Sequence, residues 1–313
     1  MTGPVLALAG GVGGAKLALG LARVLPPERL TVVVNTGDDE CFHGLHVSPD
    51  LDTVMYTLAG LANPEAGWGL AGETFNALEM LRRYGADTWF NLGDRDLATH
   101  IRRTQLLRQG ASLSQVTTEL CQRLGIAHRV VPMSNDPVRT VVDTDAGPLP
   151  MQRYFVQQGS QPVVKSIRYE GAQRAAATPE FLAALSAAAL VVLCPSNPFL
   201  SIGPVLALPG ILERLENLGP TTLRVAVSPI VGGAAVRGPA AKIMGELGQE
   251  VSCVGVARQY RGICDVFVID RQDRHRAGDI EKLGLKPVVE SIIMETESDK
   301  IALAQRILEL EGC

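Results

Sequence analysis

A glycine-rich loop near the N-terminus has the composition of a phosphate-binding site. Residues 10–16 read Gly-Gly-Val-Gly-Gly-Ala-Lys, between an apolar run at residues 5–9 and a helical pattern that begins at Leu17. Glycines let the backbone approach a ligand closely, and free N–H groups at a helix N-terminus attract anions. Lys16 occupies the third glycine position of a dinucleotide fingerprint, and the Gly-Lys-Ser/Thr ending of a P-loop is missing. We therefore expect a phosphate loop of another kind, with a tight glycine turn as the alternative.

Four aspartates lie within fifteen residues shortly after this loop: Asp38, Asp39, Asp50 and Asp52. Asp38 and Asp39 follow the apolar run at residues 30–34, and ligands of open parallel sheets bind outside the carboxyl ends of strands. Carboxylate oxygens suit Mg²⁺, which proteins usually share with substrate phosphates. The pattern predicts a hard-cation site, although Asp52 has an equally good alternative role as a helix cap.

A second acidic turn occupies residues 91–96, Asn-Leu-Gly-Asp-Arg-Asp, directly after the apolar residues 88–90. Asp94 could act in catalysis or cap the helix that follows. Arg95 stands between two acids, which favours either an ion-pair network or a substrate contact.

Two further loops are rich in serine, glycine and proline, at residues 194–204 and 228–239. Each follows a predicted strand, and their hydroxyls and backbone amides suit nucleotide or phosphate recognition. No G-x-S-x-G elbow is present, so the serines are not predicted to be nucleophiles.

Alternating strands and helices must position these loops. Strand, helix and strand over residues 5–34 form a βαβ unit, and the same rhythm returns after residue 188. The later strands are expected at residues 190–193, 223–227, 251–256 and 266–269, with helices near residues 209–217, 240–248 and 298–310. The sequence thus predicts an α/β fold with a Rossmann-like, doubly wound and mostly parallel sheet.

The middle of the chain has a different pattern. Helices are expected from about residue 75 to 81, from Asp94 to Leu107, and after a capping box formed by Ser112 and Gln115. Strands with intervening turns are expected at residues 140–143, 153–157 and 165–169. We predict one discontinuous domain over residues 1–313, in which residues 1–60 and 188–313 form the nucleotide-binding core and residues 61–187 a helical and antiparallel insertion.

Composition excludes several classes of protein. Charged residues are 20% of the 313 and the net charge is −4, which argues against a nucleic-acid partner. The six cysteines form no C-x-x-C pair, so neither a zinc ribbon nor a dithiol motif is supported. No apolar run is long enough to span a bilayer, and the N-terminal segment does not match a signal peptide. We expect a cytoplasmic protein without membrane contact.

Together these motifs resemble the 2-phospho-L-lactate transferase family of coenzyme F-420 biosynthesis. The resemblance runs over nearly the whole chain and includes residues 10–16, 35–39, 92–100 and 195–204. It implies a Mg²⁺-dependent transferase of substituted phosphate groups with small-molecule substrates. A phospho-acid moiety would pass from a guanosine diphospho-linked donor to the ribityl hydroxyl of the deazaflavin Fo, and GMP would leave. The resemblance also suggests a homodimer.

The family resemblance assigns roles to particular residues. Asp38 and Asp50 would hold Mg²⁺, with Asp38 counted among the catalytic residues, and Asp39 or Asp94 would orient or deprotonate the attacking hydroxyl. The residues expected to bind nucleotide and substrate are Gly10, Gly11, Val12, Gly13, Gly14, Lys16, Asn91, Arg95, Ser196, Asn197, Ser201, Gly203 and Ser228.

Residues 151–154, Met-Gln-Arg-Tyr, depart from the family pattern, in which Phe-Gln-Glu and an aromatic residue are common. Arg153 replaces the acid, so the donor acid stays open among phospholactate, phosphoenolpyruvate and 3-phosphoglycerate. The arginine could pair with a carboxylate or phosphate of the donor. Its alternative role is that of a solvated residue on an exposed strand face.

Two other functions compete with the transferase. A nicotinamide oxidoreductase fits poorly, because the fingerprint glycine and the ribose-binding acid are both misplaced. A non-catalytic nucleotide-binding regulator with the same glycine loop is the stronger alternative. The acidic turns at Asp38, Asp50 and Asp94 favour the enzyme, since metal-assisted transfer needs them.

Overall fold

A seven-stranded parallel sheet forms the centre of the protein. The structure is a computed structural model and describes residues 3–310. The strand order is β14-β13-β10-β9-β1-β2-β5, and all neighbouring strands are parallel. The expected doubly wound α/β fold is confirmed. The strands are β1 (Val5–Ala9), β2 (Leu30–Val34), β5 (Arg129–Pro132), β9 (Leu190–Leu193), β10 (Leu223–Val227), β13 (Val266–Asp270) and β14 (Lys286–Glu290).

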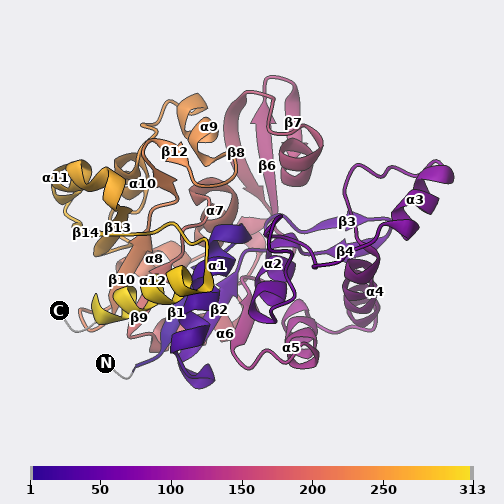
Figure 1. Cartoon of the computed structure of the whole chain (residues 1–313), viewed down its shortest axis with the longest axis horizontal. Coiled ribbons are helices and arrows are strands. Elements are labelled where there is room, and N and C mark those ends of the chain that lie inside the picture. The colour runs from indigo at the N-terminus through magenta and orange to yellow at the C-terminus, as the bar shows by residue number, and fades with distance from the viewer. Residues whose placement is uncertain (1–2, 311–313) are drawn as a thin grey trace.

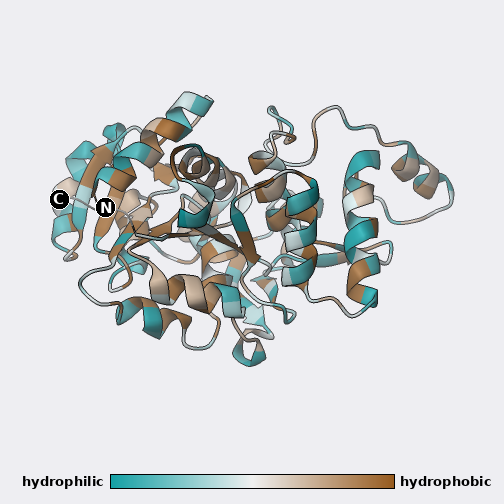
Figure 2. Cartoon of the chain, turned by 90° about the horizontal axis from the view of Figure 1, so that it is seen from below, coloured by the Kyte–Doolittle hydropathy of each residue, from teal (hydrophilic) through white to brown (hydrophobic). Residues whose placement is uncertain are grey.

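Helices cover both faces of this sheet (Figure 1). Alternate residues of β1 enter two separate cores: Val5, Ala7 and Ala9 pack on one side, and Leu6 and Leu8 on the other. The first core is covered by α1 (Gly11–Val24), α2 (Pro49–Leu58), α5 (Leu113–Arg123) and α12 (Glu297–Glu309). The second is covered by α6 (Pro179–Ala187), α7 (Gly203–Leu206), α8 (Ile211–Glu216), α9 (Ala240–Glu246), α10 (Cys253–Gln259) and α11 (Ala277–Glu281). In Figure 2 the apolar strands lie between these layers, whose helices turn hydrophilic residues outward.

A lateral lobe extends from the sheet on the side of β2 (Figure 1). It contains the hairpin of β3 (Glu40–Phe42) and β4 (Leu45–Val47) together with α3 (Asn76–Arg83) and α4 (Asp94–Arg108). Its small core is aromatic: the Phe42 and Phe90 rings stack at 4.1 Å, and Trp89 meets both of them edge-on. The three helices predicted for this part of the chain, α3, α4 and the capping-box helix α5, are confirmed.

An antiparallel unit stands above the sheet, formed by β6 (Arg139–Thr144), β7 (Gly147–Pro150) and β8 (Val164–Glu170) in the order β7-β6-β8. The strand predicted at residues 153–157 is wrong, because this segment is the π-helix η2 (Arg153–Gln157). Its burial does not alternate. Tyr154 is buried, whereas Arg153 before it and residues 155–157 after it are all exposed. The strand lies earlier, at β7, an edge position where prolines are tolerated.

The strand predicted at residues 251–256 is also wrong: the helix α10 begins at Cys253. Ser252 Oγ accepts a hydrogen bond from Gly255 N and caps this helix, whose first five residues are all buried. A short, continuously apolar segment cannot be assigned from periodicity alone. The sheet gains β14 instead, and also β5, which comes from within residues 61–187.

The remaining elements are short: η1 (Pro27–Arg29), η3 (Ala172–Arg174), η4 (Pro198–Ile202), η5 (Arg271–Arg276), β11 (Ile230–Val231) and β12 (Ala234–Ala235). Within residues 3–310, no helix is both long enough and apolar enough to cross a membrane.

Candidate functional site

The loops at the carboxyl ends of β1, β2 and β9 meet at one edge of the sheet. Ser196 connects two of them, because its Oγ accepts a hydrogen bond from Gly10 N at 3.1 Å and donates one to Gly10 O at 2.8 Å. Asn35, which follows β2, donates from Nδ2 to Leu200 O at 3.2 Å in the loop after β9. Three segments that are distant in sequence therefore form one buried polar site.

The carboxylate of Asp50, a residue of α2, lies at the N-terminus of α1. Its Oδ1 accepts a hydrogen bond from Gly11 N at 2.7 Å, and the positive end of the helix dipole stabilises a carboxylate there. A Cβ atom on Gly10 would lie 2.5 Å from Asp50 Oδ2 and 2.6 Å from Ser201 Cβ, so only glycine fits. The first amide of the glycine loop thus binds a carboxylate of the protein itself.

The side-chain amide of Asn35 lies between two of the predicted metal ligands. Its Nδ2 donates to Asp38 Oδ1 at 3.2 Å and to Asp50 Oδ2 at 2.9 Å. Gln152 reaches the same place from the antiparallel unit, since its Nε2 donates to Asp38 Oδ2 at 3.1 Å. Asp38 and Asp50 are 4% and 7% exposed, so the two predicted ligands are brought together in a nearly dry environment.

Burial of these carboxyl groups disfavours their ionised forms. Burial, reinforced by the negative charges of Asp50 and Asp39, raises the pKa of Asp38 well above its usual range. Burial raises the pKa of Asp50 to about 6. It raises the pKa of Asp39 as well, although hydrogen bonds to Asp39 Oδ2 from His46 Nε2 at 2.9 Å and Ser48 Oγ at 2.7 Å oppose the shift. A cation bound among these groups would relieve their mutual repulsion.

The residues present fit a hard divalent cation. The potential ligands are carboxylate and hydroxyl oxygens, which Mg²⁺ prefers. Two buried oxygens nearby in the sequence, Thr36 Oγ1 and Asp39 Oδ1, have no hydrogen-bond partner among the described residues. Unsatisfied buried oxygens are costly, and binding of a cation or of hydrated substrate groups would satisfy them.

Asp52 belongs to a separate buried network between α2 and α4. Its two carboxylate oxygens accept hydrogen bonds from the guanidinium of Arg103, which is 1% exposed. His100 Nε2 lies 3.2 Å from Asp96 Oδ2, and Tyr56 donates to Asp96 Oδ1 at 2.6 Å. Asp52, Asp96 and His100 are close enough together to hold a metal, but the Arg103 guanidinium already supplies the positive charge. This network therefore fastens α4 to the helix that carries Asp50.

Asp94 caps a neighbouring helix. Its carboxylate accepts hydrogen bonds from the backbone N–H groups of Asn76 at 3.0 Å and Ala77 at 2.9 Å, and from Thr74 Oγ1 at 2.6 Å. These bonds hold the pKa of Asp94 below its usual range. Arg95 is exposed and donates to Ala71 O, and Asn91 is exposed. Within residues 3–310, no hydrogen bond joins these three residues to Asp38, Asp39 or Asp50.

The predicted ligands after β9 and β10 mostly organise their own loops. Asn197 Oδ1 accepts from Phe199 N at 2.9 Å and Leu200 N at 3.0 Å, whereas its buried Nδ2 has no partner in the described part of the chain. Gly203 leaves room for the Tyr169 hydroxyl, which a Cβ atom would meet. Ser228 Oγ closes a turn with the backbone of Ile230.

The other predicted residues of the glycine loop contact neighbouring segments. A Cβ atom on Gly13 would collide with Pro195 O, and one on Gly14 would lie 2.6 Å from Ser196 Oγ. A Cβ atom on Gly67 would lie 2.8 Å from Val12 Cγ1. Lys16 is half-buried and donates from Nζ to Met294 O at 2.7 Å. The glycines therefore serve at least the close approach of α1 to the loop after β9.

Comparison with known families identifies the chain. The family model described as 2-phospho-L-lactate transferase CofD matches residues 5–301. The chain belongs to the CofD family. It is therefore a transferase of coenzyme F-420 biosynthesis, and the regulator and oxidoreductase alternatives are not supported.

Relatives of this CofD-family chain carry two kinds of name. A phosphoenolpyruvate transferase of Streptomyces griseus subsp. griseus is 42% identical over 312 residues, with 98% of each chain covered. A 2-phospho-L-lactate transferase of Methanosarcina mazei is 38% identical over 305 residues, with 97% of this chain and 99% of the relative covered. A solved structure from Bacillus halodurans, a member of the upf0052 family, has a TM-score of 0.62 at 16% identity and covers 98% of this chain and 99% of its own, which shows the shared fold.

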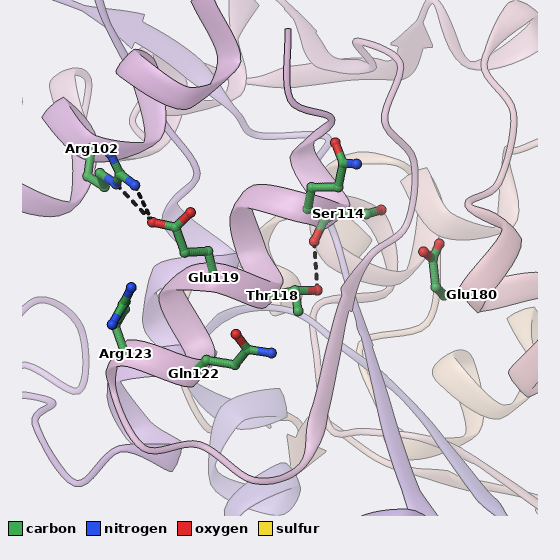
Figure 3. A pocket seen from close by; sticks show the side chains of 8 residues that line it. Arg102, Ser114, Thr118, Glu119, Gln122, Arg123 and Glu180 are labelled. Carbon is green, nitrogen blue, oxygen red and sulfur yellow. Dashed lines mark hydrogen bonds and ion pairs between the residues drawn. The ribbon is translucent and has the colours of Figure 1, made fainter. Parts of the chain in front are cut away.

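A polar groove beside α5 of the CofD-family chain lies away from this site (Figure 3). It has a volume of about 430 Å³, and its lining residues include Arg102, Glu119, Arg123 and Glu180. Arg102 forms an ion pair with Glu119 across it. None of the predicted site residues lines this groove.

Asn35 and Gln152 were not among the site residues predicted from the sequence. Asn35 belongs to the acidic turn after β2, so its position at a strand end was a usable signal. Gln152 matches the glutamine of the family pattern at residues 151–154, but it is 114 residues from Asp38, and nothing in that motif connects it to the acidic turn.

Proposed function

We propose that this CofD-family protein transfers a phospho-acid moiety from a guanosine diphospho-linked donor to the ribityl hydroxyl of Fo, releases GMP, and depends on Mg²⁺ held by Asp38 and Asp50. We further propose that it acts in the cytoplasm as a homodimer. Membership of the family supports the type of reaction. The arrangement of carboxylates around the glycine loop supports the metal.

One observation carries the proposal: Asp50 lies at the N-terminus of α1, where a donor phosphate would be expected to bind. A phosphate next to the Asp50 and Asp38 carboxylates would be repelled in this low-dielectric environment. A divalent cation held by Asp38 and Asp50 would remove that repulsion. The acidic turn and the glycine loop are then parts of one site for a metal and a diphosphate.

The chemistry needs charge neutralisation and alignment more than a covalent nucleophile. When bound, Mg²⁺ neutralises charge on the diphosphate and so stabilises the transition state. Asp38 and Asp50 hold it through carboxylate oxygens. The amides of the first turn of α1 bind phosphate oxygens, and the loops after β9 and β10 bind the guanosine.

The reacting atoms exchange one bond for another. The ribityl oxygen of Fo forms a bond to the phosphorus that carries the small acid, and the bond between that phosphorus and the GMP oxygen breaks. The hydroxyl proton passes to a carboxylate, and GMP leaves with the electron pair of the broken bond. Asp39 suits this role better than Asp94, because Asp39 Oδ1 has no hydrogen-bond partner within residues 3–310 and the raised pKa of Asp39 makes it the stronger base. The Asp94 carboxylate is held by the N-terminus of α3.

The donor acid stays open among phospholactate, phosphoenolpyruvate and 3-phosphoglycerate, since relatives of both named types are about equally similar to this chain. We propose that Arg153 contributes to this choice. Arg153 directly follows Gln152, which contacts Asp38, and its guanidinium lies 5.4 Å from the centre of the Trp89 ring. The guanidinium of this exposed arginine can pair with the carboxylate of the donor acid.

A reconstitution experiment tests the proposal. The protein is incubated with Fo, GTP, Mg²⁺, a donor-forming guanylyltransferase and one of the three phospho-acids at a time. We expect GMP release and a product whose mass equals Fo plus the phospho-acid group, and EDTA should abolish both. Absence of product with all three acids would contradict the proposal.

A further inference from the structure

Two neutral amides hold the two oxygens of the Asp38 carboxylate. Asn35 Nδ2 donates to Oδ1 at 3.2 Å, and Gln152 Nε2 donates to Oδ2 at 3.1 Å. Asn35 comes from the end of β2, whereas Gln152 lies between β7 and η2 of the antiparallel unit. Both amide side chains are buried, so water does not compete for these bonds.

Neighbouring groups determine the direction of both amides. Asn35 Oδ1 accepts a hydrogen bond from Gly37 N at 2.8 Å, which leaves Nδ2 facing Asp38 and Asp50. A flipped Asn35 would place its carbonyl oxygen against two carboxylates. Gln152 faces an oxygen of the Asp38 carboxyl group, which in its ionised form accepts hydrogen bonds but donates none. The NH₂ group of Gln152 must therefore point toward Asp38.

We propose that Gln152 and Asn35 are positioning residues that fix the orientation of the Asp38 carboxylate for binding of a divalent cation by Asp38 and Asp50. This inference rests on the proposed function, because it presupposes the metal site. The amides bind Asp38 without adding positive charge, and the full charge of the carboxylate stays available to the cation. Groups that hold a metal ligand in this way commonly contribute to metal affinity.

Asp52 shows the contrasting arrangement within the same protein. Its carboxylate is held by the guanidinium of Arg103, which neutralises it and leaves no charge for a metal. Asp38 and Asp52 are both buried aspartates, but one is held by amides and the other by a cation. The partner type therefore separates a carboxylate that can bind a metal from one that serves the fold.

A binding experiment without substrates tests this inference. Mn²⁺, a paramagnetic substitute for Mg²⁺, is titrated into the wild type, Gln152→Met and Gln158→Met, and the free ion is measured by electron paramagnetic resonance. Gln158 is exposed at the end of η2, so the Gln158→Met control makes the same chemical change outside the site. We expect Gln152→Met to bind Mn²⁺ about 10-fold more weakly or worse, and the control to match the wild type. Transfer by Gln152→Met should recover as the Mn²⁺ concentration is raised.

The outcomes separate this inference from the proposed function. If the wild type binds Mn²⁺ and Gln152→Met binds it equally well, the positioning role is wrong while the metal site stands. If the wild type binds no Mn²⁺, both are wrong. Should Gln152→Met fail to fold, as judged by its thermal transition, Gln152→Asn keeps the amide but is one methylene too short to reach Asp38. An unchanged Mn²⁺ affinity of Gln152→Asn would then overturn the inference.

Discussion

The backbone N–H of Gly11 donates a hydrogen bond to Asp50 Oδ1 at 2.7 Å, so one carboxylate connects the first turn of α2 to the glycine loop. Gly11 has a φ of +60°, a left-handed conformation that glycine adopts without strain. The two motifs are separate in the sequence but joined in the structure. A substitution in one should therefore alter the geometry of the other.

Replacing Asp38 should abolish most of the transfer activity. Asp38→Asn removes a charged ligand from the proposed metal site, so activity at limiting Mg²⁺ should fall by more than about 100-fold, beyond the loss typical of residues that only support a ligand. Initial rates over a Mg²⁺ series measure this. Asp87→Asn is the matched control, because Asp87 is exposed on the lateral lobe. Full activity of Asp38→Asn at limiting Mg²⁺ would exclude Asp38 as a ligand.

The metal-free protein should lose stability as the pH rises from about 4 to about 7. The pKa of Asp50 is raised from 3.8 to about 6, so between these values the native state keeps a proton that the unfolded chain has lost. Above a pH of about 6 the Asp50 carboxyl group must ionise in its buried site. Over the whole range the free energy of unfolding should therefore fall by on the order of 3 kcal/mol. Asp38 adds to the fall in the same direction.

Urea denaturation in EDTA at several pH values measures this dependence. Saturating Mg²⁺ should suppress the fall, since a bound cation stabilises the ionised carboxylates, and Asp50→Asn should reduce it. A metal-free protein that becomes more stable over this range would contradict the assigned pKa directions.

Asp52→Asn should destabilise the fold by about 3–5 kcal/mol, because it leaves the charge of Arg103 buried and unpaired. The sequence alone predicted Asp52 as either a metal ligand or a helix cap, and in the structure both of its carboxylate oxygens accept hydrogen bonds from Arg103. Combining Asp52→Leu with Arg103→Met removes both charges and should recover much of the loss. Chemical denaturation of the single and double variants tests this, and equal stability of Asp52→Asn and wild type would argue against the buried pair.

Gly13→Ala should lower the free energy of unfolding by about 1–3 kcal/mol through overpacking, because the added Cβ collides with Pro195 O. The sequence alone would place this effect on phosphate binding with the core untouched. Gly278→Ala is a suitable control, since a Cβ there meets no atom within 4 Å. Thermal unfolding of both variants, with calorimetry of GDP binding, separates the effect on the fold from the effect on the ligand. A Gly13→Ala protein of wild-type stability would refute the packing role.

Arg153→Glu should change the relative rates with the three donors. Arg153 is exposed and in contact with Trp89, not on a strand face, so its guanidinium is accessible to a substrate acid. Donors compared in competition give ratios of kcat/KM, which measure specificity directly. Arg153→Lys keeps the charge without the planar fork and shows whether bidentate geometry matters. An equal loss with all donors would mean that Arg153 supports general binding and does not select the acid.

The βαβ core could be predicted from the sequence because its signals are local. β1 and β2 occupy the expected residues, since each is a short apolar run bounded by glycine or proline. Residues 251–256 failed the same reasoning, because the first five residues of α10 are all buried and show no amphipathic period. Residues 153–157 failed because a π-helix has no distinctive sequence pattern.

The site was predictable to a similar extent. Asp38 and Asp50 were predicted as metal ligands because carboxylates near a glycine loop have a recognisable chemistry, and the structure brings the two together at Asn35. The amide partners were missed, since neutral side chains such as Gln152 acquire their role only when the antiparallel unit brings them to the sheet edge. Asp94 shows the converse case, in which a suggestive motif caps α3.

The strand order has a consequence for synthesis on the ribosome. β1 pairs with β2, the next strand in sequence, on one side and with β9 on the other. The contact between Gly10 and Ser196 in the site therefore joins residues that are 186 positions apart. While the chain is being made, β1 keeps an open apolar edge until β9 has emerged, and such edges invite pairing with other chains. Products that terminate before β9 should therefore aggregate, because this edge then stays unpaired.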